Sequence, residues 1–384
     1  MAAPEASARA AGPLVAGQPA QARRWPRRIG RALAWAGAII AALLLAFPTG
    51  RYLLRAAWEE GRILAARQSI SFVIDDDATD AVTRSKLEVV LAARAFAHDS
   101  VGLRTGNSFT MYSKLRRDTL VLVLSGAYRD RLARYTWWFP IVGRVPYKGY
   151  FDYGAAKRAR DDMLADGFDT SLRPASAFST LGFFNDPILS TTLGSDSIEL
   201  ANTVIHELTH NTFYAPGQAV FNESFANFVG SRGAAWFFRS RGSMDAAEQA
   251  DARWEDEKLL GTFWATLYHS IDSAFAAHPG EGGAARAARL AARDTLYRLA
   301  RIDLVETLGP KLRTVGPRYL ERVPLDNAAL LARRVYLTDL PLFDEVYRRE
   351  GGDLRKAVQR VVQLARSRPE DPYGAVRGYV GRDF

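Results

Sequence analysis

Two short segments of this chain contain residue types that can hold a metal ion and activate water. The first is His-Glu-Leu-Thr-His at 206–210, and the second is Phe-Asn-Glu-Ser-Phe-Ala-Asn-Phe-Val at 221–229. The chain has only 5 histidines among 384 residues, so two of them framing a glutamate is not expected by accident. An HExxH pattern on a helix is typical of a metal site whose glutamate is a general base.

The spacing within the first segment suits a single ion. Residues four apart lie on one face of a helix, so His206 and His210 can point at the same metal. Glu207 lies beside them, where it can accept a proton from metal-bound water without binding the ion. Two neutral imidazoles and one carboxylate suit zinc, and a fourth position left to water makes such a site catalytic. Glu223 in the second segment is the predicted third ligand, so the sequence predicts one Zn²⁺ ion.

Two points around this site stay open. An HExxH pattern also arises on surface helices that bind no metal, although the neighbouring Asn-Glu-x-Phe-Ala sequence argues against that alternative. Asn227 lies one turn beyond Glu223. It is expected either to hydrogen-bond the free nitrogen of a ligand histidine or to make a solvent or capping contact.

The elements that must position these residues follow from apolar periodicity. The two segments are expected on helices at 198–211 and 220–230, and Phe221, Phe225 and Phe228 should pack the second helix. Other helices are expected at 52–67, 81–98 and 153–166, strands at 119–125 and 175–184, and a mostly helical chain beyond residue 245. The predicted fold class is therefore α+β and mostly helical, with a small sheet and a helical C-terminal part.

The N-terminal arm is basic. Residues 1–67 contain ten arginines and three glutamates, which supply seven of the nine net positive charges. Residues 1–30 are predicted to be a disordered cytoplasmic tail. The uncharged stretch Ala32–Phe47 predicts one transmembrane helix over 31–50, with the arginines on the cytoplasmic side. A cleaved signal peptide is the alternative, which the lack of a clean small-x-small site disfavours.

Composition excludes several classes of function. The chain has no cysteine, which excludes disulfides, a thiolate zinc site and a cysteine nucleophile. The positive charge gathers in the arm and leaves a nearly neutral body, so nucleic acid is not an expected partner.

The two motifs together resemble those of the gluzincin metallopeptidases, in which the glutamate of the second motif is the third zinc ligand. A wider set of segments resembles a bacterial family of predicted aminopeptidases; these segments are 139–152, 178–190, the two zinc motifs and 326–330. The sequence departs from that family at Trp138 and Gly230, neither of which is a metal ligand.

The resemblance implies further parts of a peptidase site. By analogy, 178–184 is expected to be an edge strand that pairs with an extended peptide. An oxyanion-stabilising Tyr or His is also expected, and Tyr150, Tyr214, Tyr268 and Tyr336 are the candidates. Aminopeptidase specificity needs an acidic pair or a loop that holds a free amine. Glu199 and Asp186 are available for that role.

The resulting hypothesis is a membrane-anchored zinc metallopeptidase, an aminopeptidase with Glu207 as general base and a peptide as substrate. Residues 51–384 are the expected peptidase domain, α+β with the metal site over 51–240 and helical over 241–384. The expected location is the bacterial inner membrane, single-pass, with the catalytic domain in the periplasm. An endopeptidase and a non-catalytic envelope interaction protein are the alternatives, and the intact Glu207 argues against the second.

Overall fold

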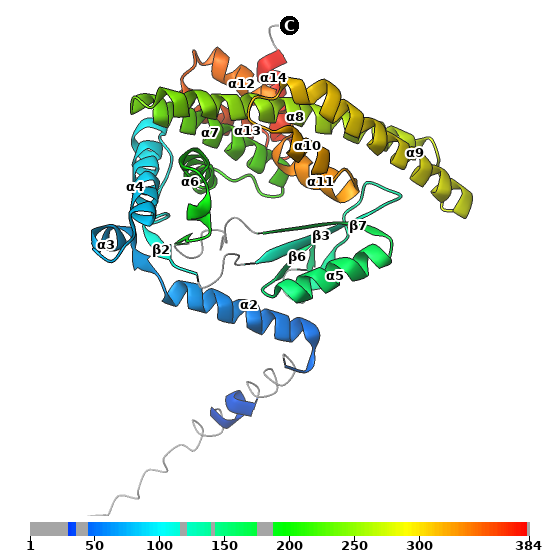
Figure 1. Ribbon diagram of the computed structural model, residues 1–384, viewed down its shortest axis with the longest axis horizontal. Coiled ribbons are helices and arrows are strands. Elements are labelled where there is room, and N and C mark those ends of the chain that lie inside the picture. The colour runs from blue at the N-terminus through cyan, green and yellow to red at the C-terminus, as the bar shows by residue number, and fades with distance from the viewer. Residues whose placement is uncertain (1–29, 36–44, 116–120, 140–142, 175–186, 382–384) are drawn as a thin grey trace, which may run out of the picture. The chain divides into compact units, whose positions relative to one another are not determined.

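The computed structural model describes residues 30–35, 45–115, 121–139, 143–174 and 187–381. The chain divides into two compact units, Met1–Trp58 and Glu59–Phe384. The second unit contains both motif segments and is mostly helical (Figure 1). The boundary predicted between residues 240 and 241 lies where one helix ends, followed by a short turn and the next helix within this unit.

Helices form most of the secondary structure of the described residues. They are α2 (Pro48–Ala65), α3 (Ile70–Asp75), α4 (Ala81–Phe96), α5 (Tyr153–Ala165), α6 (Ser197–Thr212), α7 (Ala219–Ser240), α8 (Met244–Ala276), α9 (Gly283–Ile302), α10 (Pro317–Arg322), α11 (Asn327–Tyr336), α12 (Leu340–Arg349), α13 (Leu354–Ser367) and α14 (Pro372–Val380). The predicted helices at 81–98, 153–166 and 198–211 are confirmed to within a turn. The second motif helix, α7, continues well beyond the predicted end at 230.

The strands are short and form small sheets. They are β1 (Gln68–Ser69), β2 (Met111–Ser113), β3 (Leu122–Tyr128), β4 (Trp137–Phe139), β5 (Gly143–Val145), β6 (Tyr147–Tyr150), β7 (Phe168–Pro174) and β8 (Ile188–Leu189). Strand β3 confirms the strand predicted near 119–125. The strand predicted at 175–184 lies outside the described residues.

The sheet that bears on the site has the order β6-β3-β7, and both of its pairings are antiparallel. Its register sets Val123 opposite Arg173 and Ala127 opposite Asp169. Helix α5 packs on one face of this sheet and α11 on the other (Figure 1). The sheet therefore supports α11, whose last residue is Tyr336.

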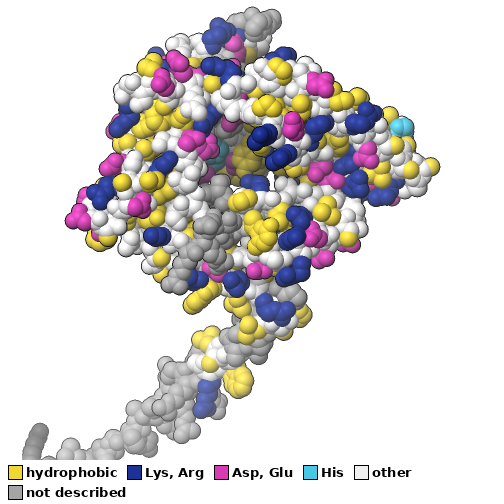
Figure 2. Space-filling view, viewed as in Figure 1, with side chains coloured by type: hydrophobic (Ala, Val, Ile, Leu, Met, Phe, Trp, Pro, Cys, Tyr) yellow, Lys and Arg dark blue, Asp and Glu magenta, His cyan; other side chains and the backbone are white. Residues whose placement is uncertain are grey.

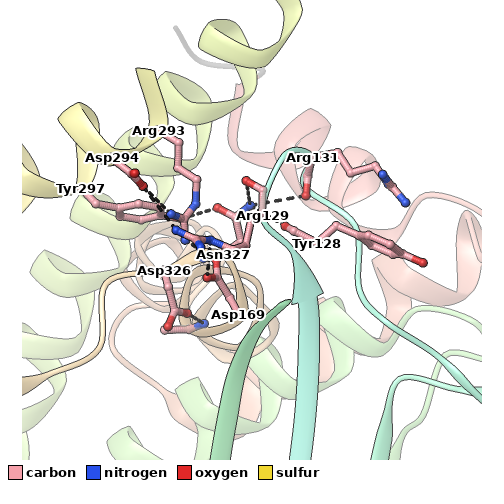
Figure 3. Close-up of polar contacts among 10 residues, drawn as sticks. Tyr128, Arg129, Arg131, Asp169, Arg293, Asp294, Tyr297, Asp326 and Asn327 are labelled. Carbon is pink, nitrogen blue, oxygen red and sulfur yellow. Dashed lines mark hydrogen bonds and ion pairs between the residues drawn. The ribbon is translucent and has the colours of Figure 1, made fainter. Parts of the chain in front are cut away.

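A buried polar network fixes the first turn of α11 (Figure 3). The Asn327 backbone N–H donates to Asp169 of β7 at 2.9 Å, and Arg293 of α9 donates to the same carboxylate. The Asn327 side chain accepts from the Tyr297 hydroxyl at 2.7 Å and donates to the Tyr128 carbonyl at 2.7 Å. Because Asn327 is fully buried, each of these bonds replaces one to water, and the network holds α11 against β7 and α9.

The predicted N-terminal transmembrane helix is wrong. Among the helices formed by the described residues, none combines the length and apolar composition that crossing a bilayer requires. Pro48 begins a new helix, α2, that contains Arg51, Arg55 and Arg62. Proline cannot continue a preceding helix without loss of a hydrogen bond, so the predicted continuation of the apolar segment belongs to a separate, charged helix. The central residues 36–44 lie outside the described part. The predicted single-pass inner-membrane location is contradicted by the same finding.

Candidate metal centre

Helix α6 places the first motif, and its start is set by polar contacts. The Asp196 carboxylate caps its start by accepting from the backbone N–H groups of Ile198 and Glu199. Arg253 of α8 binds the same carboxylate through two hydrogen bonds, of 3.1 and 2.6 Å. Val204 and Ile205 are fully buried behind the motif, as predicted. One face of α6 is therefore fixed in the core, and the opposite face carries His206 and His210.

Helix α7 approaches α6 closely because glycines lie at the contact. A Cβ atom on Gly230 would lie 2.2 Å from Asn202 Oδ1 and 3.1 Å from His206 Cβ. A Cβ atom on Gly233 would lie 2.9 Å from Ile205 Cγ2. Glycine at 230 is thus explained by packing, since any side chain there would enter the space of Asn202. The close approach brings Glu223 to the two histidines.

The phenylalanines of α7 hold the other side of that helix. Phe221, Phe225 and Phe228 are each at most 1% exposed. All three rings contact the ring of Phe343 from α12, with centroid distances of 5.8, 5.7 and 5.8 Å. The predicted packing role of these residues is confirmed, and it leaves Glu223 on the face that turns toward α6.

The three predicted ligands converge. Glu223 Oε2 lies 3.4 Å from His206 Nε2, and Glu223 Oε1 lies 3.6 Å from His210 Nε2. One ligand atom from each residue can be chosen so that all three lie within 4.8 Å of one another, a spacing at which they could hold a metal ion. Their side chains are 15–25% exposed, so the group is sheltered but open to solvent. Figure 2 shows a histidine inside a hollow on one face of the molecule, with Lys and Arg side chains along its rim.

The donor set and its distances fit zinc. Zinc–ligand bonds of about 2.0–2.2 Å at tetrahedral angles place the ligand atoms about 3.3–3.6 Å apart. The two nitrogen–oxygen distances, 3.4 and 3.6 Å, fall in that range. They also exceed the usual length of a hydrogen bond, about 2.7–3.2 Å. The three side chains are therefore spaced as the ligands of a common ion would be.

The electrostatics of the group also favour a cation. Burial acts to raise the pKa of Glu223, but the two imidazoles outweigh it and lower the pKa to about 2. Burial acts to lower the pKa of His210, but Glu223 and Glu207 outweigh it and raise that pKa. Both pKa shifts stabilise the ionised forms of Glu223 and His210 in contact with each other. A metal ion can replace the positive charge in that contact.

Glu207 keeps a free carboxylate beside the ligands. It is partly buried, and among the described residues it makes no hydrogen bond or ion pair. Its negative charge acts on His210 and on the hydroxyl of Tyr336. A carboxylate in electrostatic contact with His210 and without a partner among the described residues is available to accept a proton.

Two of the four candidate tyrosines lie near the ligands. Burial raises the pKa of Tyr336, and the carboxylates of Glu223 and Glu207 add to the rise, so its hydroxyl lies in their field. The ring of Tyr214 lies edge-on to His210 with centroids 6.1 Å apart. By contrast, Tyr268 lies under Arg334 and Tyr150 under Lys148. The charge interactions of Tyr336 and the ring contact of Tyr214 therefore favour these two tyrosines over the other two.

Asn227 does not contact a ligand histidine in the described part of the chain. Its Nδ2 donates to Glu257 Oε2 of α8 at 3.0 Å. Burial raises the pKa of Glu257 to about 7, and the charge of Glu199 adds to the rise. The sequence singled out Glu199 but gave no signal for Glu257, since the two meet only through the packing of α6, α7 and α8. Asp186 lies outside the described residues.

The fold and site together define a mostly helical domain with small sheets, in which two helices bring together three side chains that could hold a metal ion. The chain belongs to the family described as "Putative aminopeptidase", whose model matches residues 51–372. Membership of this family makes a peptidase, a hydrolase of peptide bonds, the expected activity. No curated protein and no solved structure gave a significant match.

Proposed function

We propose that the protein is a zinc-dependent peptidase of the gluzincin type, with His206, His210 and Glu223 as the ligands of one Zn²⁺ ion. The observation that carries the proposal is the spacing of the ligand atoms, 3.4 and 3.6 Å from the Glu223 oxygens to the two imidazole nitrogens. The family match supports the peptidase activity. The peptidase domain would comprise residues 51–384.

Zinc bound there would supply a Lewis acid that acidifies water and polarises the scissile carbonyl. Glu207 is the proposed general base: its carboxylate takes a proton from the attacking water and delivers it to the leaving amine. Such proton transfer contributes about 10²–10⁴-fold to a rate. Glu207 follows His206 directly, so the α6 backbone fixes its distance from the ligands.

Tyr336 is the proposed donor to the oxyanion. The negative charges of Glu223 and Glu207 act on its hydroxyl, which supports a position beside the reacting carbonyl. A donor of this kind is worth about 10²–10³-fold in kcat. Tyr214 is the comparison residue, because its ring also lies near His210.

An exopeptidase that removes N-terminal residues is favoured over an endopeptidase by the carboxylates of Glu199 and Glu257. Glu199 lies on α6 and Glu257 lies on α8. The charge of Glu199 raises the pKa of Glu257 and also interacts with His206. An ammonium group between such carboxylates would gain favourable charge interactions. A peptide with a free amine should therefore be cleaved, and its N-acetylated form should not.

Metal analysis and peptidase assays of three proteins test this function: wild type, Glu207→Gln and the control Glu248→Gln, which changes an exposed residue of α8. We expect all three to bind one zinc ion per chain. Wild type and the control should cleave peptides, and Glu207→Gln should lose at least 100-fold in kcat. Absence of zinc from all three proteins would refute the proposal, as would equal cleavage by Glu207→Gln.

The tyrosine assignment is tested in the same assay. Tyr336→Phe should lower kcat by about 10²–10³-fold with little change in KM, because the lost bond forms only in the transition state. Tyr214→Phe should change kcat far less. The reverse order of the two effects would transfer the role to Tyr214.

A further inference from the structure

Tyr214 presents its ring to solvent next to the candidate metal ligands. The residue is 50% exposed. Its ring lies edge-on to the ring of His210, with the two centroids 6.1 Å apart and the two planes at 65°. His210 Nε2 in turn lies 3.6 Å from Glu223 Oε1. One side of the ligand group is therefore bordered by an aromatic ring that is half open to solvent.

The local backbone turns this ring away from the core. Helix α6 ends at Thr212, and Phe213 has an extended conformation, with φ −151° and ψ 135°. Neighbouring side chains on an extended backbone point to opposite sides. Phe213 accordingly packs against the hydrophobic core, whereas Tyr214 points outward beside His210. The exposure of Tyr214 thus follows from the way in which the chain leaves α6.

Hydrogen bonds fix the backbone on both sides of Tyr214. The side chain of Asn222, a residue that is 2% exposed, accepts from the Ala215 N–H and donates to the Ala215 carbonyl, both at 2.8 Å. The backbone N–H of Arg104 donates to the Thr212 hydroxyl at 2.9 Å, and its guanidinium donates to the Thr212 carbonyl at 2.6 Å. The ring of Tyr214 is therefore held out from a fixed connection between α6 and α7.

These features distinguish Tyr214 from an ordinary surface aromatic residue. Single exposed apolar side chains are common on proteins and need no explanation. The ring of Tyr214, however, contacts a candidate ligand histidine, and its backbone is already ordered. A tyrosine also has only two χ angles, so it loses little conformational entropy when another group packs on its ring. Tyr214 is therefore well suited to contact a group that is bound at the metal centre.

We propose that the ring of Tyr214 forms one wall of a subsite for an apolar or aromatic side chain of the peptide substrate, next to the scissile bond. The inference rests on the proposed peptidase function and adds a substrate class to it. His210 is a proposed ligand at the reacting centre, so a side chain next to the scissile bond lies within reach of a ring in contact with His210. Aromatic rings pair favourably with other rings in edge-on or offset arrangements.

Three peptides measure the preference. Phe-Ala-Ala and Ala-Phe-Ala are each compared with Ala-Ala-Ala, with the full-length, zinc-loaded protein as the enzyme. At least one of the two Phe peptides should be favoured by about tenfold or more in kcat/KM, because a single methylene group in an apolar site already contributes about that factor. Product analysis then shows whether the favoured Phe precedes or follows the bond that is cleaved.

Three variants test the residue. Tyr214→Ala should bring the kcat/KM ratio of the favoured Phe peptide to Ala-Ala-Ala toward one, whatever its absolute rates. Tyr214→Phe should keep the ratio, because the ring remains and only the hydroxyl is lost; loss of the ratio in this variant would overturn the assignment to the ring. Tyr153→Ala, which changes a tyrosine of α5 that is 71% exposed, is the control and should keep the full wild-type ratio.

Binding measurements separate failure of the subsite from failure of the proposed function. The peptides are titrated by calorimetry into zinc-loaded Glu207→Gln, with and without Tyr214→Ala. Tighter binding of a Phe peptide that Tyr214→Ala abolishes supports the subsite even if no peptide is hydrolysed. Equal hydrolysis and equal binding of all three peptides would overturn the subsite and leave the peptidase assignment intact. A preference for Phe that survives Tyr214→Ala would overturn it as well.

Discussion

Glu257 should make the stability of this protein fall as pH rises toward neutrality. Burial raises its pKa to about 7 from an ordinary value of 4.5, Glu199 adds to the rise, and the hydrogen bond from Asn227 opposes it. The folded chain therefore retains a proton that the unfolded chain releases. The resulting stabilisation is complete below pH 4.5 and is lost as pH rises through about 7.

The size of the effect follows from the two pKa values. A difference from 4.5 to about 7, at about 1.4 kcal/mol per unit, gives an upper limit of about 3.5 kcal/mol. Glutamine cannot ionise and can still accept the hydrogen bond from Asn227. We therefore expect Glu257→Gln to raise the free energy of unfolding by about 1–3 kcal/mol at pH 8, and by less than about 1 kcal/mol at pH 5.

Urea unfolding of the metal-free protein, followed by tryptophan fluorescence at both pH values, measures this difference. Comparison of variant with wild type at the same pH cancels the titration of all other groups. Glu248→Gln, on the same helix and exposed, is the control and should have no pH-dependent effect. An equal change at pH 5 and pH 8, or a loss of stability at pH 8, would refute the argument that burial raises the pKa of Glu257.

Three further changes test the packing and the ligands. Gly230→Ala puts a methyl group 2.2 Å from Asn202 Oδ1 and should cost about 1–3 kcal/mol in urea unfolding, whereas Gly283→Ala, with nothing within 4 Å, should not destabilise the protein. Glu223→Gln should weaken zinc binding by at least about 100-fold in a chelator competition, and retained affinity would exclude it as a ligand. Asn327→Ala removes fully buried bonds to Tyr297 and Tyr128 and should lower the free energy of unfolding by about 2–4 kcal/mol; a change below 1 kcal/mol would contradict the role of the network in fixing α11.

The parts of the site that follow from local periodicity could be predicted from the sequence. His206 and His210 share a face because they are four apart on a helix, and that geometry needs no tertiary information. The phenylalanines of α7 repeat at helical spacing, so the buried side of α7 was also predictable, and with it the exposure of Glu223. The extension of α7 to Ser240 was not predicted, because the glycine at 230 is typical of a helix end. Gly230 and Gly233 instead mark close contact with α6.

The prediction of an N-terminal transmembrane helix failed because it rested on apolar composition alone. The backbone conformation at Pro48 decides where the next helix begins. The predicted transmembrane helix over 31–50 runs through Pro48 to reach a spanning length. Proline at the first position of a helix is favourable, since its missing N–H is unpaired there in any case. Pro48, which begins α2, thus separates the arginines of α2 from the apolar stretch.

Residues whose role depends on distant packing could not be found from the sequence. Tyr336 was one of four equivalent candidates, and its position is decided about ten residues away, where Asn327 binds Asp169 and Tyr297. The same strand that holds Asn327 through Asp169 presents Arg173 four residues later, on the same face of the sheet. Strand β7 therefore anchors the start of α11 through Asp169. The guanidinium of Arg173, on the same strand, interacts with Tyr336, the last residue of α11. A change at Asp169 should consequently disturb the position of Tyr336, although none of the three proposed metal ligands contacts Asp169 in the described part of the chain.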